Sequence, residues 1–304
     1  CMENGKIAVA AGLENGLGFA STEFHVIRFG SKVIPDFYRY YLLQMKIRKQ
    51  AEKNMTGSAG QKRVPTNFIQ NLTVPLPPLA TQRKIVAILE KAEATQRLRT
   101  EADALVQDLV QSIFIDMFGD PSKNLKTWPF KRLGDVIEVT SGHGFKFEEY
   151  SDNGIRLLRI NNVSFGDITW DQIAYLPYEY VEKYPNLVLM ENDILMALNR
   201  PILGNKLKIG MISKEDAPAI LYQRVGRIDI LDEDKLNRQY LFHLMRTQYF
   251  LSELAAKLAG SDQPYINPTA LVKINIPLPP IAIQERFGEV AASMQVNYKN
   301  CQKS

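Results

Sequence analysis

The chain has 304 residues, of which 45% are hydrophobic and 23% are charged. This composition is typical of a globular protein with room for two domains, and we expect neither a signal peptide nor a membrane span, because no apolar run is long enough. The net charge of +4 permits nucleic-acid binding but does not argue for it.

Cysteine and histidine are few and scattered. Cys1 and Cys301 stand at opposite ends of the chain, and the three histidines are His25, His143 and His243. This spacing excludes a disulfide framework and a metal cluster, and it suits a reducing compartment. We therefore expect a cytoplasmic protein that binds no metal.

The first segment, residues 1–74, resembles the later part of a domain. Short alternating runs at 5–10 and 24–29 predict strands, and Pro35 opens a helix with Tyr38, Tyr41, Leu42 and Met45 near one face. That aromatic stripe is typical of a core, and less so of a base-stacking platform. The glycine-rich connection 12–18 lacks the lysine and Ser/Thr of a phosphate-binding P-loop.

A basic stretch follows this helix. Between residues 46 and 63, six cations accompany only one acidic residue, Glu52, and the stretch ends in a Gly-Ser loop that carries Gln61, Lys62 and Arg63. Two interpretations stay open. The cations form a solvated face, or they contact the phosphates of a nucleic acid.

Residues 75–118 predict an extended entry and one long helix. The prolines of Val74–Pro78 forbid a helix interior, and from Thr81 no proline or glycine occurs before Gly119. Apolar residues recur at helical spacing, and the helix would be roughly 55 Å long. Its nearly balanced charges indicate a solvated exterior. The helix is either part of a core or a spacer packed against a partner helix.

A linker from Asp120 to Phe130 leads into a second unit that mixes strands and helices. The unit starts at 128–142, and strands are predicted after it at 155–160, 188–190, 194–198, 207–212 and 224–230, with one or two helices within 236–258. The proline motif then recurs. Val74-Pro-Leu-Pro-Pro-Leu-Ala-Thr-Gln82 matches Ile276-Pro-Leu-Pro-Pro-Ile-Ala-Ile-Gln284 at an offset of 202 residues.

The same offset, applied without gaps, matches residues further upstream. Tyr38 falls on Tyr240, Leu42 on Leu244 and Gln61 on Gln263. The sequence therefore predicts a duplicated unit: a domain, a proline-rich exit and a helix. In the second copy the basic loop becomes 260–265, with Asp262 and Tyr265 in place of cations, which is consistent with two sites that read different sequences.

These features together resemble the specificity subunits of type I restriction–modification enzymes. The resemblance rests on the domain start Trp128–Asp135, on Ser141–Phe145, on Ile155–Ile160, on Asp193–Arg200 and on both proline boxes. It implies an α+β fold, in which target-recognition domains of mixed strands and helices are joined by a long helix that forms an antiparallel coiled coil. The implied domains are 1–79, the C-terminal part of a first recognition domain; 80–119, the spacer helix; 120–280, a second recognition domain; and 281–304, a truncated second helix.

The resemblance also implies a non-catalytic protein without a cofactor. Each recognition domain would read half of a bipartite site in double-stranded DNA, and the helices would set the spacing and dock methyltransferase (modification) subunits, with restriction subunits in the complete enzyme. The first domain lacks its front portion and the second helix is short. We therefore expect an incomplete gene product, an engineered fragment or half of an assembly that a second copy completes through the long helix.

DNA reading needs bidentate donors and acceptors for base edges and cations for phosphates. The predicted DNA-binding residues are polar residues at strand ends and loops, each of which could also be a surface or turn residue. They are Gln61, Lys62, Arg63, Arg156, Arg159, Asn161, Asn199, Arg200, Lys206, Lys208, Gln223, Arg224, Gln263 and Tyr265.

Two other functions compete with DNA recognition. A DNA methyltransferase would need an Asn/Asp-Pro-Pro-Tyr/Phe box and a glycine-rich loop for the methyl donor, and the Pro-Pro pairs here follow Leu76 and Leu278. A helical scaffold without DNA specificity would use only the long helix. Binding of S-adenosylmethionine would identify the enzyme, and salt-dependent DNA binding would argue against the scaffold.

Overall fold

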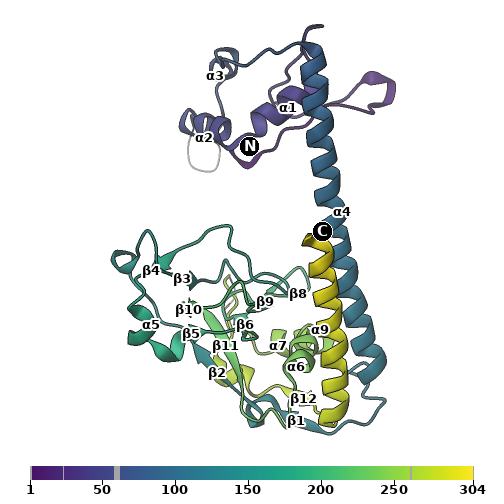
Figure 1. The fold of residues 1–304 in the computed structure, drawn as a ribbon, viewed down its shortest axis with the longest axis vertical. Coiled ribbons are helices and arrows are strands. Elements are labelled where there is room, and N and C mark those ends of the chain that lie inside the picture. The colour runs from purple at the N-terminus through teal and green to yellow at the C-terminus, as the bar shows by residue number, and fades with distance from the viewer. Residues whose placement is uncertain (1, 23, 58–61, 261, 304) are drawn as a thin grey trace. The chain divides into compact units, whose positions relative to one another are not determined.

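The computed structural model describes residues 2–22, 24–57, 62–260 and 262–303 (Figure 1). The chain forms two compact units, residues 1–103 and 104–304. The boundary lies inside one long helix, α4 (Leu79–Phe118). The predicted division into four parts stays a prediction, because the two compact units meet between Asp103 and Ala104 and not at a predicted boundary.

The first unit is mainly helical. Its elements are η1 (Met2–Asn4), η2 (Glu14–Gly16), α1 (Pro35–Leu43), α2 (Met45–Lys53), α3 (Thr66–Gln70) and the first part of α4. Phe37 and Tyr38 of α1 pack on Val86 of α4. Beside this small core, Arg39 and Tyr40 bind Glu93 at 2.9 and 2.8 Å. Both hydrogen bonds lower the pKa of the Glu93 carboxyl, and the bond from Arg39 has the larger effect.

Two expectations for this unit were wrong. The segments 5–10 and 24–29 form no strand, and Phe24 is 63% exposed. Neither run has a strand neighbour within the described part of the chain, and an unpaired run gains no ladder of hydrogen bonds. Met45 is 67% exposed, because Gln44, with ψ of 136°, interrupts the helix and Met45 begins α2 instead of extending the α1 face.

Helix α4 confirms the predicted long helix. It has 40 residues and is therefore about 60 Å long. It starts two residues before the expected Thr81 and ends at Phe118, where Gly119 takes a φ of 79°. That left-handed conformation is one that glycine adopts without strain, so the predicted stop is confirmed.

The second unit contains two four-stranded sheets, with strand orders β4-β3-β10-β5 and β2-β11-β6-β9. Two further pairs are β1-β12 and β7-β8, and among the named strands of the described residues only β3 and β10 are paired in parallel. The strands are β1 (Phe130–Arg132), β2 (Ile137–Ser141), β3 (Ile155–Leu158), β4 (Tyr175–Leu176), β5 (Val188–Leu189), β6 (Ile194–Ala197), β7 (Ile202–Leu203), β8 (Lys206–Leu207), β9 (Ile209–Met211), β10 (Ala219–Leu221), β11 (Val225–Ile230) and β12 (Asn275–Pro277).

The helices of the second unit are α5 (Tyr180–Lys183), α6 (Arg238–Met245), α7 (Gln248–Ala255), α8 (Pro268–Leu271) and α9 (Ile281–Lys303), with short turns η3 (Leu133–Asp135), η4 (Phe147–Glu149) and η5 (Pro185–Leu187). Helices α6, α7, α8 and α9 share a core with the sheet β2-β11-β6-β9, whereas α5 packs against the sheet β4-β3-β10-β5. The described residues thus confirm an α+β architecture of mixed strands and helices.

An aromatic cluster joins the end of α4 to this core. Phe114 and Phe118 of α4 contact Tyr240 and Phe287, with ring centroids between 4.7 and 5.6 Å apart. Each such pair contributes about 0.5–1.5 kcal/mol beyond its buried area. Because β1 follows α4, β12 precedes α9 and the two strands are paired, the C-terminal part of α4 and α9 run antiparallel (Figure 1).

The structure confirms the internal repeat element by element. Helices α1, α2, α3 and α4 correspond to α6, α7, α8 and α9, and their starts follow the offset of 202 residues to within one residue. Tyr38 donates to Pro75 O and Tyr240 to Pro277 O, both at 2.7 Å. The repeat therefore preserves contacts between side chain and backbone as well as secondary structure.

The glutamine of each proline box explains why the box recurs. Gln82 and Gln284 are fully buried, and their amide nitrogens donate to Pro77 O and Pro279 O at 2.8 and 2.7 Å. Each amide oxygen accepts a hydrogen bond of 2.9 Å from the backbone N–H of the residue that precedes a helix, Ile34 before α1 and Asn237 before α6. These two donors are 203 residues apart, one more than the repeat offset of 202. The box is thus a structural joint.

Candidate nucleic-acid interface

The candidate interface forms where strands of the second unit end. Since β3 and β10 are parallel neighbours, their C-terminal ends lie at the same edge, and Tyr222 N donates to Leu158 O at 3.0 Å. Arg159 follows β3 directly, and Gln223 and Arg224 form the turn from β10 into β11. The fold therefore brings these three predicted residues to one edge.

Strand β6 ends beside the same turn. It pairs antiparallel with β11, and Leu198 N donates to Arg224 O at 2.8 Å, which places Asn199 and Arg200 next to Arg224. Arg200 and Arg224 have φ of 46° and 68°. This left-handed region costs a non-glycine residue about 1–2 kcal/mol. Two strained arginines at one edge suggest a function, because strain of this kind concentrates at functional sites.

Lysines extend this edge. Lys208 Nζ donates to Ile160 O at 3.0 Å, which joins the β8–β9 segment to the exit of β3 near Asn161. Partial burial lowers the pKa of Lys208, and the charge of Arg200 lowers it further. An anion at this edge would relieve that repulsion. Lys206, on the β7–β8 hairpin, is exposed.

The loop 262–265 completes the edge. Arg200 N donates to Pro264 O at 2.6 Å, and Tyr265 forms backbone bridges with Asn199 and Ala259. The Tyr265 side chain is 39% exposed. An aromatic ring and the exposed amide of Gln263 thus stand beside the cations of the strand ends.

We call this set of residues the strand-end surface. It consists of Arg159, Asn161, Asn199, Arg200, Lys206, Lys208, Gln223, Arg224, Gln263 and Tyr265. Their roles in DNA contact stay predictions.

Arg156 does not join this surface. Its guanidinium donates to Glu215 O at 2.5 Å and lies 4.7 Å from the centre of the Trp170 ring. Both contacts anchor it to the neighbouring loop. Arg159, three residues later, donates to Gln172 O at 3.1 Å, while its buried Nε has no partner among the described atoms.

The predicted residues of the first unit lie in the equivalent loop. Gln61 is outside the described residues. Arg63 and Thr56 exchange backbone hydrogen bonds of 2.8 and 2.9 Å, as Tyr265 and Ala259 do in the second copy. Lys62 and Arg63 are exposed. The scaffold is repeated while its side chains differ, and phosphate contact by these residues stays a prediction.

Sequence reasoning missed the Gly-His-Gly segment after β2 as part of the edge. Gln223 N donates to His143 O at 2.9 Å. A Cβ on Gly142 would lie 2.3 Å from Tyr222 O, and one on Gly144 would lie 2.8 Å from Gln223 Oε1. Both glycines therefore permit a close approach to the β10–β11 turn. The glycine spacing in Ser141–Phe145 was the available signal.

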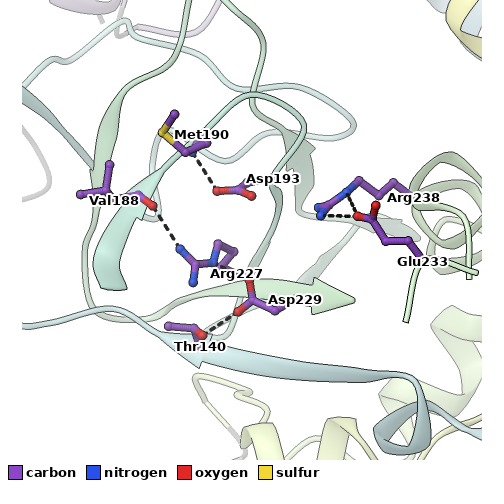
Figure 2. A network of polar contacts seen from close by, with 8 residues as sticks. All are labelled: Thr140, Val188, Met190, Asp193, Arg227, Asp229, Glu233 and Arg238. Atoms are coloured by element: carbon purple, nitrogen blue, oxygen red, sulfur yellow. Dashed lines mark hydrogen bonds and ion pairs between the residues drawn. The ribbon is translucent and has the colours of Figure 1, made fainter. Parts of the chain in front are cut away.

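A polar network holds the sheet behind this edge (Figure 2). Arg227 Nε binds Asp229 Oδ1 at 2.6 Å, and its Nη1 donates to Val188 O at 3.1 Å. Thr140 donates to the other Asp229 oxygen at 2.6 Å. The network thus ties β11 to β2 on one side and to β5 on the other.

Asp193 lies near this network and accepts from Met190 N at 2.8 Å (Figure 2). Burial raises the pKa of its carboxyl, while the Met190 N–H and the Arg227 and Arg238 charges oppose the rise. Within the described ranges no three His, Cys, Asp or Glu side chains are placed to hold a metal ion. Asp193 and Asp229 instead make the hydrogen bonds and the ion pair described above.

Comparison with known proteins decides the family. A family model described as the type I restriction modification DNA specificity domain matches residues 3–106 and 125–290. The chain belongs to this family. The two matched segments agree with the internal repeat, since each contains one copy.

Two curated relatives carry related descriptions. The chain is 36% identical to the type I restriction enzyme MjaVIII specificity subunit of Methanocaldococcus jannaschii, over 90% of this chain and 66% of that protein. It is 27% identical to the EcoAI specificity subunit of Escherichia coli, over 100% of this chain and 66% of that protein. The chain therefore spans about two thirds of these relatives.

Solved structures of the family are also similar to this chain. The type I restriction-modification S subunit from M. genitalium gives a TM-score of 0.48 at 14% identity, over 90% of this chain and 68% of that one. The HsdS subunit from Thermoanaerobacter tengcongensis gives a TM-score of 0.43 at 22% identity, over 89% of this chain and 65% of that one. Among the described residues of the present chain, no helix is both long and apolar enough to cross a membrane.

Proposed function

We propose that this chain is a DNA-recognition component of a type I restriction–modification enzyme and that it is not itself catalytic. The observation that carries the proposal is the convergence of arginines, lysines and amides on the strand-end surface, in a chain that belongs to a DNA specificity family. Guanidinium and amide groups can read base edges by paired hydrogen bonds, while lysines bind phosphates.

The long helix supports the remaining part of the proposal. Because α4 is a continuous helix of about 60 Å, it can hold two recognition domains at a set separation. Its charged and exposed faces would dock the modification subunits, with restriction subunits joining the complete cytoplasmic enzyme. Each recognition domain would read one half of a bipartite site in double-stranded DNA.

The strand-end surface gives a direct test by DNA binding. Arg200→Ala should weaken binding of the cognate half-site by about 1–3 kcal/mol and relax specificity at one base pair. Lys206→Ala should weaken all sequences alike and reduce the salt slope by about one. Lys123→Ala, an exposed cation in the linker after α4, is the matched control and should change neither.

The DNA sequence is best found by methylome sequencing of cells that carry this chain with its modification subunit. One bipartite motif that disappears with the Arg200→Ala variant would support the proposal. DNA binding that is indifferent to both Arg200 and Lys206 would refute the assignment of the surface. Tight binding of S-adenosylmethionine by the purified chain alone would refute the non-catalytic role.

A further inference from the structure

The hairpin β7–β8 places an exposed turn beside the other residues of the strand-end surface. Leu203 pairs with Lys206 across the hairpin, and Gly204 and Asn205 form the turn, with φ of 54° and 60°. Positive φ at both turn positions is typical of two-residue turns whose twist matches that of the strands. All four residues are exposed, and a Cβ on Gly204 would meet no atom within 4 Å. The tip of the hairpin therefore faces open space.

The base of the hairpin is fixed to the rest of the second unit. Lys208 N donates to Pro201 O at 2.7 Å, and Ala197 N donates to Lys208 O at 3.0 Å, which joins the hairpin to β6. Leu207 is buried in the main core, and Ile202 is partly buried against it. A ribbon that is anchored in this way loses little conformational entropy when a ligand binds its tip.

The two faces of the hairpin carry different side chains. Ile202 pairs with Leu207, and Leu203 pairs with Lys206, so each pair shares one face. The first pair packs on the core, whereas Leu203, 39% exposed, lies beside the exposed Lys206. The outer face therefore offers a nonpolar contact next to a cation, which suits the thymine methyl group and the phosphate of a DNA groove.

Asn205 is the polar side chain at the tip. It makes no side-chain hydrogen bond with any residue that the structure describes. Its amide therefore has an acceptor and two donors available for a ligand. In the major groove an asparagine amide can form two hydrogen bonds with adenine, through N6 and N7, and this pairing distinguishes adenine from the other bases.

The dimensions and charge of the hairpin select the major groove. Paired strands lie about 4.8 Å apart, so a two-stranded ribbon with its side chains is too wide for the minor groove of about 6 Å, whereas the major groove of about 12 Å admits it. The segment 199–208 contains three cations and no acidic residue. Phosphates along the groove therefore attract the hairpin.

We propose that the β7–β8 hairpin enters the major groove of the half-site read by the second unit, where Asn205 binds an adenine and Leu203 contacts a thymine methyl group. Lys206 binds a phosphate beside them. The half-site therefore contains an A·T pair that Asn205 selects. This inference rests on the proposed function and deepens it, because it assigns one base pair to one residue.

Asn205→Gly separates base recognition from the shape of the turn. Glycine adopts a φ of 60° without strain, so the variant keeps the turn and loses the amide. In cells with the modification subunit, we expect its methylome motif to become degenerate at one A·T pair and to stay otherwise unchanged. Replacing that pair by G·C should weaken DNA binding by the wild type at least about fivefold, and binding by the variant less than about twofold.

The matched control is Asn192→Gly. Asn192 is also an exposed asparagine with a positive φ, 72°, but it lies before β6, at the opposite end of that strand from Arg200. This variant should leave the motif and the affinities unchanged.

A second arm tests the thymine contact and needs no change at Asn205. Deoxyuridine, which lacks the methyl group, replaces each thymine of the half-site in turn. At one position the wild type should bind about fourfold more weakly, as expected for one buried methyl group. Leu203→Ala should bind the thymine and deoxyuridine duplexes equally well at that position.

Three results would overturn the inference. If Asn205→Gly keeps the wild-type motif while Arg200→Ala relaxes its own position, Asn205 only shapes the turn, and the proposed function still stands. If the relaxed position is a G·C pair, or if no thymine methyl group affects binding, the contacts are assigned wrongly. If the wild type shows no sequence-specific DNA binding, the proposed function fails and this inference fails with it.

Discussion

The buried glutamine at the start of α9 gives the sharpest stability prediction. Gln284 is fully buried and makes three bonds: it accepts from Asn237 N at 2.9 Å and donates to Lys235 O and Pro279 O at 3.1 and 2.7 Å. Gln284→Ala leaves one buried N–H and two carbonyls without partners. Each such group costs about 1–3 kcal/mol, and since water can enter the space, we expect a loss of about 3 kcal/mol in total.

The assay follows from the placement of tryptophan. Both tryptophans, Trp128 and Trp170, belong to the second unit, so their fluorescence reports its unfolding. With a urea slope of about 2–3 kcal/mol per molar, the midpoint should fall by about 1 M. The control is Gln248→Ala, which truncates an exposed glutamine of α7 in the same unit and should stay within about 0.5 kcal/mol. If Gln284→Ala matches the control, the structural explanation of the proline box is wrong.

Three further predictions concern the second unit. Arg224→Gly should stabilise the unit by about 1 kcal/mol in urea unfolding, because glycine adopts a φ of 68° without strain. The same variant should weaken DNA binding. A loss of stability would refute the claim that Arg224 is strained. Gly144→Ala should lower DNA affinity roughly tenfold, or by about 1–2 kcal/mol, because the added methyl group displaces Gln223. The effect should vanish when Gln223 is also replaced by alanine. If the loss of affinity persists in that double variant, Gly144 has a general structural role. Burial, and to a smaller extent the charge of Arg246, lowers the pKa of His243 from 6.5 to about 3. Because the pKa is lower in the folded state than in the unfolded state, the neutral imidazole contributes stability that is complete above pH 6.5. This stability is lost as the pH falls toward 3. Between pH 6.5 and 4.5 the wild type should lose about 2–3 kcal/mol more than His243→Leu in urea titrations, with the exposed His143→Leu as control; equal pH slopes for wild type and His243→Leu would contradict this.

The sequence was sufficient for features that depend on neighbours along the chain. Helix α4 follows from the absence of proline and glycine between Thr81 and Gly119, and its end follows from Gly119. The repeat was visible as a pattern, and the structure supplied its reason in the paired bonds of Gln82 and Gln284. Local signals failed at 5–10 and 24–29, because alternation predicts a strand only where a partner strand exists.

The candidate site depended on tertiary structure. Arg156 and Arg159 are three residues apart, and the sequence gives no reason to prefer either as a DNA-binding residue. In the structure Arg156 is held by Glu215 and Trp170, whereas Arg159 lies at the end of β3. Which strands are neighbours decides this difference, and strand order is set by packing over the whole unit. The sequence by itself determined a duplicated chain with a long helix and the family that it resembles. Only the tertiary structure decided which cations meet, because β3, β6 and β10 start at Ile155, Ile194 and Ala219, up to 64 residues apart along the chain.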